Sequence, residues 1–478
     1  MLNRHTVVLF LSFLVLLLIY ETSFHLVILT LFFLAALLNV FKSPTSELWL
    51  LAVVTSEYSI IFAGLISLLL LTNFYAVSFT LVGTILGLTA LVLFLLPIRD
   101  AYFIAQKLPS DLEKAFRQMK NVTIKNDQKL INKPFNIFKL FQTIPKVSFR
   151  TLTYVTYDDA TLTLDFYGSV VTGKRPCVIV IHGGSWIGGN SKQLSELNRH
   201  LAQAGYHCAA INYRLAPQWK CPAPIEDTAA ALTYLRQHAD ELNIDQNNFV
   251  LLGRSAGGQI ALLAAYTVQQ SGIKGVINFY GPADMIWGYM TPTNPLVPIE
   301  DTAAALTYLR QHADELNIDQ NNFVLLGRSA GGQIALLAAY TVQQSGIKGV
   351  INFYGPADMI WGYMTPTNPL VLDSRQTLAR YIGGDYFEMP DKYAASSPIE
   401  FVNRQTVPTL TFHGLTDSLV FYEHSRRLDA KLHQNDVPHY YLELPWATHG
   451  FDYNLNGPGG QLSTYAIDYF LNVVTNQQ

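Results

Sequence analysis

The sequence predicts an α/β fold, with a mostly parallel sheet flanked by helices, preceded by membrane-spanning helices. Three observations predict it. Residues 1–97 are almost entirely apolar, short apolar runs alternate with helical stretches from residue 149 onward, and residues 224–297 recur without a substitution as residues 298–371, an offset of 74 (298 − 224). We expect a transmembrane helical region at 1–97, a juxtamembrane helix and linker at 98–148, and a globular α/β domain at 149–478.

About four transmembrane helices fit the apolar region, at residues 6–20, 24–41, 48–71 and 74–97. The first is short for a bilayer, which needs about 20 residues per helix. A cleaved signal peptide is the alternative, because a positive start precedes an apolar run. It is disfavoured, since no small-residue cleavage site follows and three more apolar runs do.

The basic residues near the spans predict the orientation of the chain. With four spans, Arg4, Lys42, Arg99 and Lys107 fall on one side of the membrane. That side is expected to be cytoplasmic, because loops rich in lysine and arginine stay inside. The globular domain would then face the cytoplasm, whereas a three-span count would reverse the orientation.

Two features next to the spans need an interpretation. Glu57 lies inside the third predicted span, where a carboxylate is a functional hypothesis by default. For a single such residue we favour a buried, hydrogen-bonded group. Residues 101–119 predict a helix along the membrane surface, broken or kinked at Pro109. Its irregular apolar stripe contains Phe103, Leu108, Leu112 and Phe116.

In the globular part, predicted strands and helices alternate along the chain. Such alternation indicates a mostly parallel sheet flanked by helices. A strand pair is expected at 151–157 and 162–167, further strands at 176–181, 207–213, 248–252, 275–280, 409–412 and 440–444, and helices at 224–240, 259–269 and 463–474.

A candidate nucleophile follows the strand at 248–252. Gly253–Gly257 reads Gly-Arg-Ser-Ala-Gly and begins a helix, and the duplication repeats it as Gly327–Gly331. Small residues allow a sharp turn that exposes the serine hydroxyl, and a helix N-terminus stabilises negative charge there. Ser255 and Ser329 are therefore both candidates. The identity of the copies indicates a recent duplication or an error in assembling the gene.

Candidate oxyanion donors follow the strand at 176–181, in the run His-Gly-Gly-Ser-Trp. Gly183 and Gly184 let backbone N–H groups approach a substrate oxygen. The residue after the nucleophile, Ala256 or Ala330, would add a further N–H. An ordinary glycine turn is the alternative.

Candidate triad partners follow two later strands. Asp417 comes shortly after the strand at 409–412, and His449 comes after the strand at 440–444. The chain order is therefore serine, acid, histidine, each near the carboxyl end of a strand. That order is typical of serine hydrolases with a parallel sheet.

On these motifs, together with Asn-Tyr-Arg-Leu-Ala-Pro at 212–217, the chain closely resembles the α/β-hydrolase carboxylesterases. It is most similar to the hormone-sensitive-lipase-like and bacterial feruloyl-esterase-like branch, over roughly residues 154–470. The resemblance implies an α/β-hydrolase fold and an acyl-enzyme mechanism without a metal or organic cofactor. In it the serine attacks an ester carbonyl, His449 transfers the proton and Asp417 orients the imidazole. The four membrane spans and the doubled nucleophile depart from the family.

Only one serine can use the single Asp417 and the single His449. Ser255 lies 72 residues after Gly183 (255 − 183), as expected, while Ser329 lies 88 before Asp417 (417 − 329). One sheet holding both copies would move Ser255 about 10 Å from its partners, at about 4.8 Å per strand. The resembled family tolerates insertions after the sixth strand, so we favour Ser255 as the nucleophile and the second copy as the excursion.

Composition excludes some classes of partner and narrows the classes of function that we expect. A net charge of −3 and a pI near 6.5 argue against nucleic-acid binding, and three cysteines give neither a disulfide framework nor a metal site. We expect an integral membrane enzyme that acts on small-molecule esters, lipid-like esters included, in an oligomeric state that the sequence leaves open. The rivals are a peptidase of the same fold and a catalytically dead membrane-bound binding or scaffold protein.

Overall fold

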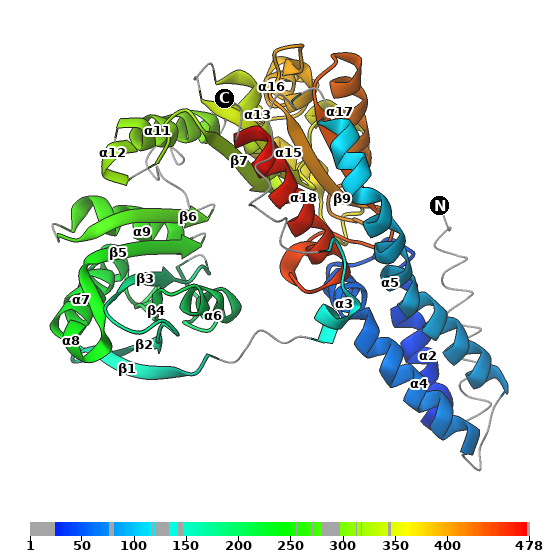
Figure 1. Cartoon of the computed structure of the whole chain (residues 1–478), viewed down its shortest axis with the longest axis horizontal. Coiled ribbons are helices and arrows are strands. Elements are labelled where there is room, and N and C mark those ends of the chain that lie inside the picture. Colours follow the sequence, from blue (N-terminus) through cyan, green and yellow to red (C-terminus); the bar gives the residue numbers. More distant parts are fainter. Residues whose placement is uncertain are drawn as a thin grey trace. The chain divides into compact units, whose positions relative to one another are not determined.

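The computed structural model describes residues 24–75, 81–116, 119, 133–141, 147–184, 186–254, 256–268, 271–279, 297–311, 313–316, 318–342 and 346–475. The chain divides into two compact units (Figure 1). Unit 1 contains Met1–Gln142 and Thr293–Gln478, and unit 2 contains Thr143–Pro292. The globular domain expected at 149–478 is therefore split, and its C-terminal half belongs with the N-terminal helices.

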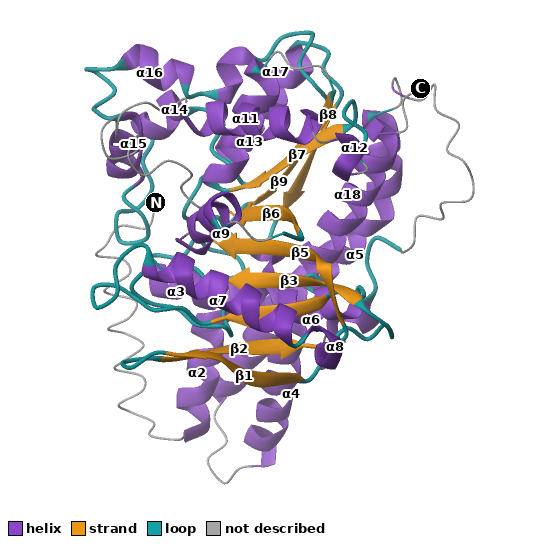
Figure 2. Ribbon diagram, turned by 90° about the vertical axis from the view of Figure 1, so that its left-hand side faces the viewer, coloured by secondary structure: helices purple, strands orange, loops and turns teal. Residues whose placement is uncertain are grey.

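Unit 2 contains a six-stranded sheet in the order β1-β2-β4-β3-β5-β6, which Figure 2 shows. The β1–β2 pair and the β2–β4 pair are antiparallel, and the remaining pairs are parallel. The predicted strands of this region are thus confirmed, with small changes at their ends. The bounds are β1 Phe149–Thr156, β2 Thr161–Tyr167, β3 Arg175–Ile181, β4 His207–Ile211, β5 Ile244–Arg254 and β6 Ile273–Phe279.

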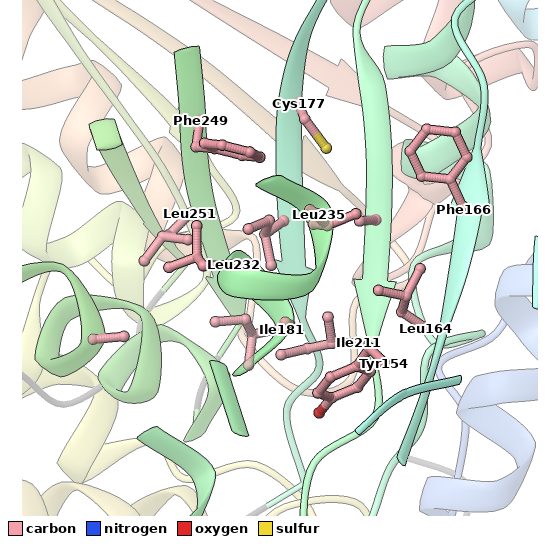
Figure 3. Packing of buried hydrophobic residues seen from close by; sticks show 14 of the residues in the cluster. Tyr154, Leu164, Phe166, Cys177, Ile181, Ile211, Leu232, Leu235, Phe249 and Leu251 are labelled. Carbon is pink, nitrogen blue, oxygen red and sulfur yellow. The ribbon is translucent and has the colours of Figure 1, made fainter. Parts of the chain in front are cut away.

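Helices cover both faces of this sheet. Alternate residues of β3 point to opposite faces, as they do in any strand, so Ile179 and Ile181 pack with α7 and α9 while Val178 packs with α6. Figure 3 shows the first of these layers, where Leu232 and Leu235 lie over Ile181 and its neighbours. The helices are α6 Ser195–Gln203, α7 Ala223–Gln237, α8 Ala239–Leu242 and α9 Ala256–Thr267.

Unit 1 contains a four-stranded parallel sheet in the order β10-β9-β8-β7. One face packs on α5 and α18, and the other on α13 and α17. The strands are β7 Phe323–Arg328, β8 Ile347–Phe353, β9 Thr409–Gly414 and β10 His439–Leu444, and the covering helices are α13 Ala330–Thr341, α17 Glu423–Gln434 and α18 Pro458–Thr475. The other elements of this part are α11 Val297–Gln311, α12 Ala313–Leu316, α14 Met359–Met364, α15 Ser374–Ile382, α16 Pro390–Ala395, η2 Ile137–Phe141, η3 Pro398–Phe401 and η4 Phe451–Tyr453.

The described strands form two sheets where we expected one, and the duplication is the reason. Each copy contributes a strand, a helix and a second strand, as β5-α9-β6 and as β7-α13-β8. The two strand pairs share one register, because Val250 faces Gly275 and Val324 faces Gly349. Each copy can therefore complete its own sheet, and the chain holds one copy more than a single sheet needs.

The N-terminal part of unit 1 is a bundle of apolar helices, α2 Phe24–Leu37, α4 Ser59–Tyr75 and α5 Leu81–Ala115, held by a shared buried cluster. Among the described helices, α5 alone is long and apolar enough by itself to cross a bilayer. The helix α3 Ser46–Glu57 and residues 59–71 of α4 would form a second span only if joined, and they are bent by 85°. The span expected at 48–71 is therefore not one straight helix, and the span expected at 6–20 lies outside the described residues.

The long helix α5 corrects the expected juxtamembrane region. Its 35 residues continue through Pro109 without a break, a length of about 52 Å at 1.5 Å per residue. Leu108, Leu112 and Phe116 are fully buried in the core of the four-stranded sheet, while Phe103 is exposed. An apolar stripe looks the same whether lipid or protein covers it, which is why the sequence indicated a membrane surface. Figure 1 shows α5 beside α18.

Candidate active site

Unit 1 brings three of the predicted residues into one hydrogen-bonded chain. His449 Nε2 lies 3.0 Å from Ser329 Oγ, and His449 Nδ1 lies 2.7 Å from Asp417 Oδ2. With Nδ1–H donating to the carboxylate, Nε2 is left to accept the proton of the serine hydroxyl. This arrangement suits a serine nucleophile with a histidine base.

The backbone at Ser329 has the geometry of a nucleophile on a sharp turn. Ser329 lies between the end of β7 and the start of α13 with φ 55° and ψ −126°, a positive-φ conformation that non-glycine residues rarely adopt. Its N–H donates to Phe353 O at 2.9 Å, which ties the turn to β8. A side chain at Gly327 would come within 1.9 Å of Gly331 O, so the turn requires glycine there. Strain of this kind is typical of functional positions.

Asp417 is fully buried and is held as a carboxylate. Its Oδ1 accepts the N–H groups of Leu419 and Val420 at 2.8 and 2.9 Å. Burial alone would raise the pKa of Asp417, but the charge and hydrogen bonds of His449 and His413 outweigh it. The pKa of this carboxyl group therefore lies well below its ordinary value, so it stays ionised and can orient His449.

His413 is a residue whose role the sequence reasoning missed. It is fully buried, and its Nε2 lies 3.1 Å from Asp417 Oδ2 and 2.9 Å from Val420 O. Both neighbours accept hydrogen bonds, so Nε2 carries the proton. Nδ1 then accepts from Ser425 Oγ at 2.7 Å. The sequence did contain a signal for this contact, because His413 lies at the end of the strand that precedes Asp417, four residues before it.

Tyr354 and Trp49 also contact His449 and were not predicted. The ring of Tyr354 lies 4.3 Å from the imidazole, and its hydroxyl donates to Asp452, which also pairs with Arg328. The indole N–H of Trp49 donates to the backbone oxygen of His449 at 2.9 Å. Trp49 is separated from His449 by 400 residues of sequence, so no local pattern could have indicated this contact.

Of the predicted oxyanion donors, Ala330 lies in unit 1 as the first residue of α13. The first N–H groups of a helix have no partner within it, so this N–H points from the N-terminus of α13 beside Ser329. Gly183, Gly184 and Ala256 belong to unit 2 and are described there on their own. Ser255, which we favoured as the nucleophile, lies outside the described residues.

The glycine loop of unit 2, which follows β3 and contains Gly183 and Gly184, differs from the expectation in the hydrogen bonding of Gly183. The N–H of Gly183 donates to Gln193 Oε1 at 2.8 Å, so it is already paired. The reason is that the loop closes on itself: a side chain at Gly184, which has φ 132°, would come within 2.0 Å of Gly188 O. The preceding His182 is buried and stacks on Tyr213 at 4.2 Å, which supports the loop from behind.

Glu57, predicted inside a span, is buried at the end of α3. Its carboxylate accepts the N–H of Gly459 at 3.2 Å and lies 3.4 Å from the indole nitrogen of Trp446. The favoured interpretation, a buried and hydrogen-bonded group, is confirmed. One partner, Gly459, lies at the N-terminus of α18, and the other, Trp446, follows β10.

Comparison with known proteins gives a family and several relatives. The BD-FAE family model matches residues 164–295 and again residues 294–432, so the first match contains nearly all of the first copy and the second match contains the whole second copy. Probable carboxylic ester hydrolase LipM of Mycobacterium tuberculosis is 24% identical over 303 residues, which are 63% of this chain and 55% of LipM. Esterase LipC of the same organism is 26% identical over 326 residues, 66% of this chain and 63% of LipC.

The chain thus spans between half and two thirds of the length of these two relatives. Among solved structures, the propionate-bound esterase Est2 of Thermogutta terrifontis is 19% identical. Its alignment covers 69% of this chain and 95% of that one, with a TM-score of 0.26.

Proposed function

This chain belongs to the BD-FAE family, and we propose on that basis that it is a membrane-anchored serine hydrolase that cleaves carboxylic esters. The observation that carries the proposal is the hydrogen-bonded chain from Ser329 through His449 to Asp417. The names of LipM and LipC, which both refer to ester hydrolysis, support an ester over an amide as substrate.

The reaction has two halves. Ser329 Oγ attacks the ester carbonyl while its proton passes to His449 Nε2, and Asp417 stabilises the imidazolium that forms. The alcohol leaves with that proton, and the acyl group stays on Ser329. Water then attacks the acyl group, again giving its proton to His449, and releases the carboxylic acid and the free serine. No metal or organic cofactor is needed for either half.

Negative charge on the substrate oxygen needs donors close to Ser329. The N–H of Ala330 at the N-terminus of α13 is the donor that unit 1 supplies, helped by the positive end of the helix dipole. Gly183 and Gly184 belong to unit 2, and a role of their N–H groups as oxyanion donors stays a prediction.

The anchoring part of the proposal rests on α5, whose first half is apolar and whose second half packs under the four-stranded sheet. Lys42 lies over the ring of Phe421, and Lys107 precedes Leu108, which is buried under the four-stranded sheet. Basic residues at this end of the helices favour a cytoplasmic hydrolase. Extraction of membranes with alkaline carbonate should leave the chain in the pellet. Protease treatment of intact cells should leave the hydrolase part uncut.

Hydrolysis of paired chromogenic substrates tests the activity. The full chain in detergent should hydrolyse p-nitrophenyl butyrate and should act at least about 100-fold more slowly on the matching p-nitroanilide. His449→Ala should lower ester hydrolysis by about 10³-fold or more, because the serine then has no base. Faster cleavage of the anilide would favour the peptidase, and no cleavage of either substrate would favour the dead binding protein.

A further inference from the structure

The segment of residues 42–57, which joins α2 to α4 and includes α3, lies on the loops that carry the candidate triad. Its central residue, Trp49, donates its indole N–H to His449 O at 2.9 Å, and the two rings meet edge to face. Its last residue, Glu57, accepts the N–H of Gly459 at 3.2 Å and thereby caps α18. The segment is therefore attached to the site itself and not only to the bundle.

The beginning of the segment is attached as well. Asn368 Nδ2 donates to Pro44 O at 2.9 Å, and the N–H of Ser46 donates to Leu370 O at 3.2 Å. Lys42 Nζ lies 3.8 Å above the ring of Phe421, close to the loop that carries Asp417. Contacts at the start, the middle and the end hold α3 in one place against unit 1.

The face of α3 that looks away from these contacts is exposed and, after Glu47 in the first turn, apolar. The buried residues of the helix are Ala52, Thr55, Ser56 and Glu57. The exposed residues include Leu48, Leu50, Leu51 and Val54, of which Leu50 is 59% exposed. Exposed leucine and valine at this density on one helix face are typical of a surface that meets a partner or a membrane.

The same exposed character continues into the helices that follow. Leu65, Leu68 and Leu71 are exposed on α4, as are Ile85, Leu88 and Val92 on α5, the helix that is long enough to cross a bilayer. Because α3 and α4 are bent by 85°, an α4 that stands along the bilayer normal leaves α3 parallel to the bilayer surface. A helix in that position, with one apolar face outward, is an interfacial helix.

We propose that α3 is an interfacial helix that seats the Ser329–His449 site on the bilayer, and that the substrate is a long-chain acyl ester dissolved in that bilayer. This inference rests on the proposed esterase function and adds the substrate class and its route. One face of α3 meets the lipid, and the other face holds His449 through Trp49. An acyl ester can therefore reach Ser329 without crossing water.

The test compares a soluble ester with a bilayer ester on the same protein. The full chain is reconstituted in phosphatidylcholine vesicles, and hydrolysis of p-nitrophenyl butyrate in water is measured beside that of 1-oleoylglycerol in the vesicles. The variant is Leu50→Glu with Val54→Glu, which places charge on the outward face of α3. The matched control is Phe387→Glu, which changes another exposed apolar residue of unit 1, 73% exposed, away from α3.

We expect the α3 variant to hydrolyse p-nitrophenyl butyrate within twofold of the wild type and 1-oleoylglycerol at least tenfold more slowly, while the control changes neither. Equal loss of both activities would overturn the proposal, because α3 would then matter only for the fold. Unchanged hydrolysis of both esters would overturn it too. A wild-type chain that hydrolyses neither ester would instead refute the esterase function itself.

Discussion

The two copies of the 74-residue stretch have the same sequence, yet they bury opposite strands. In the first copy β5 lies between β3 and β6, and Leu252 is 2% exposed. In the second copy the equivalent strand, β7, is at the edge of its sheet, and the corresponding Leu326 is 52% exposed. The next strand shows the reverse, because Ile277 on the edge strand β6 is 41% exposed and its counterpart Ile351 on β8 is 1% exposed.

The serine turns differ in the same way. In unit 2 a side chain at Gly257 would come within 2.2 Å of Ile181 O, and Gln259 accepts the indole N–H of Trp186, so this turn packs against the glycine loop. In unit 1 no described atom lies within 4 Å of the equivalent position on Gly331. There the equivalent glutamine, Gln333, is buried and donates to Ser396 O.

In each copy, the strand that lies between two other strands of its sheet is buried, and the strand at the edge of the sheet is exposed. The exposed edge is where the other half of a single sheet would pair. The first copy has the glycine loop as neighbour, and the second has the acid and the histidine. Since the two strand pairs share one register, a single copy would pair with β3 on one side and β9 on the other. The comparison teaches that the extra copy leaves the glycine loop in one unit and the Asp417–His449 pair in the other, which we interpret as the division of one proposed site.

Removing one copy should change the rate of ester hydrolysis more than any other change proposed below. Deleting residues 224–297 or residues 298–371 produces the same polypeptide. In it we expect one serine turn to contact the glycine loop, Asp417 and His449. We expect p-nitrophenyl butyrate hydrolysis to rise about 10²- to 10³-fold, the size of the contribution of one oxyanion donor. Steady-state kinetics on the full and the shortened chain measure it. An unchanged or lower kcat/KM in a folded shortened chain would contradict the divided site.

His413 belongs to unit 1, so its removal should affect only a site built on Ser329. In His413→Gln we expect kcat to fall about tenfold with KM within twofold, because Asp417 loses a hydrogen bond and its position. His439→Gln is the control. A change in KM alone, or an unchanged kcat, would count against this positioning role.

Replacing His424 should give the smallest effect, a change in the pH dependence of the unfolding free energy. This change measures how tightly the end of the second copy packs against α17. Its Nδ1 accepts the N–H of Asp358, and burial, with the nearby charges of His413 and Arg427, lowers its pKa to about 3. The unfolded chain, with a histidine pKa near 6.5, binds the proton first as the pH falls. Stability due to this group is thus complete above about pH 6.5 and is lost progressively toward pH 3.

Between pH 7 and pH 5 the wild type should lose about 2 kcal/mol more unfolding free energy than His424→Asn, at about 1.4 kcal/mol per pH unit below pH 6.5. Urea unfolding followed by tryptophan fluorescence measures this difference. His433→Asn, at an exposed histidine of the same helix, should behave as the wild type. Identical pH slopes in all three proteins would show that the segment around Asp358 is not docked as described.

Much of the fold was predictable because its signals are local. The apolar run of β3 and the alternation of strands and helices predicted elements that the structure confirms. The order of Ser329, Asp417 and His449 along the chain indicated which residues would meet. The predictions that failed depend on tertiary contacts, which a sequence pattern does not specify. The apolar stripe that contains Leu108 and Leu112 is as compatible with lipid as with protein.

The choice between the two serines lay beyond local sequence for a simple reason. Ser255 and Ser329 have identical neighbours on both sides, so no motif distinguishes them. Our preference for Ser255 used its spacing from Gly183, the position at which the resembled family tolerates insertions, and the earlier synthesis of the first copy. The structure joins Ser329 to His449, which lies 120 positions away (449 − 329), and through His449 to Asp417, 88 positions away (417 − 329).

Labelling with a fluorophosphonate probe tests most directly whether Ser329 is the nucleophile. The tryptic peptides that begin at Ser255 and Ser329 are identical, so mass spectrometry of the wild type cannot tell the two serines apart. Ser255→Ala and Ser329→Ala must therefore be labelled separately. The account predicts that Ser255→Ala labels like the wild type and that Ser329→Ala does not label. Full labelling of Ser329→Ala, or loss of labelling in Ser255→Ala, would contradict it.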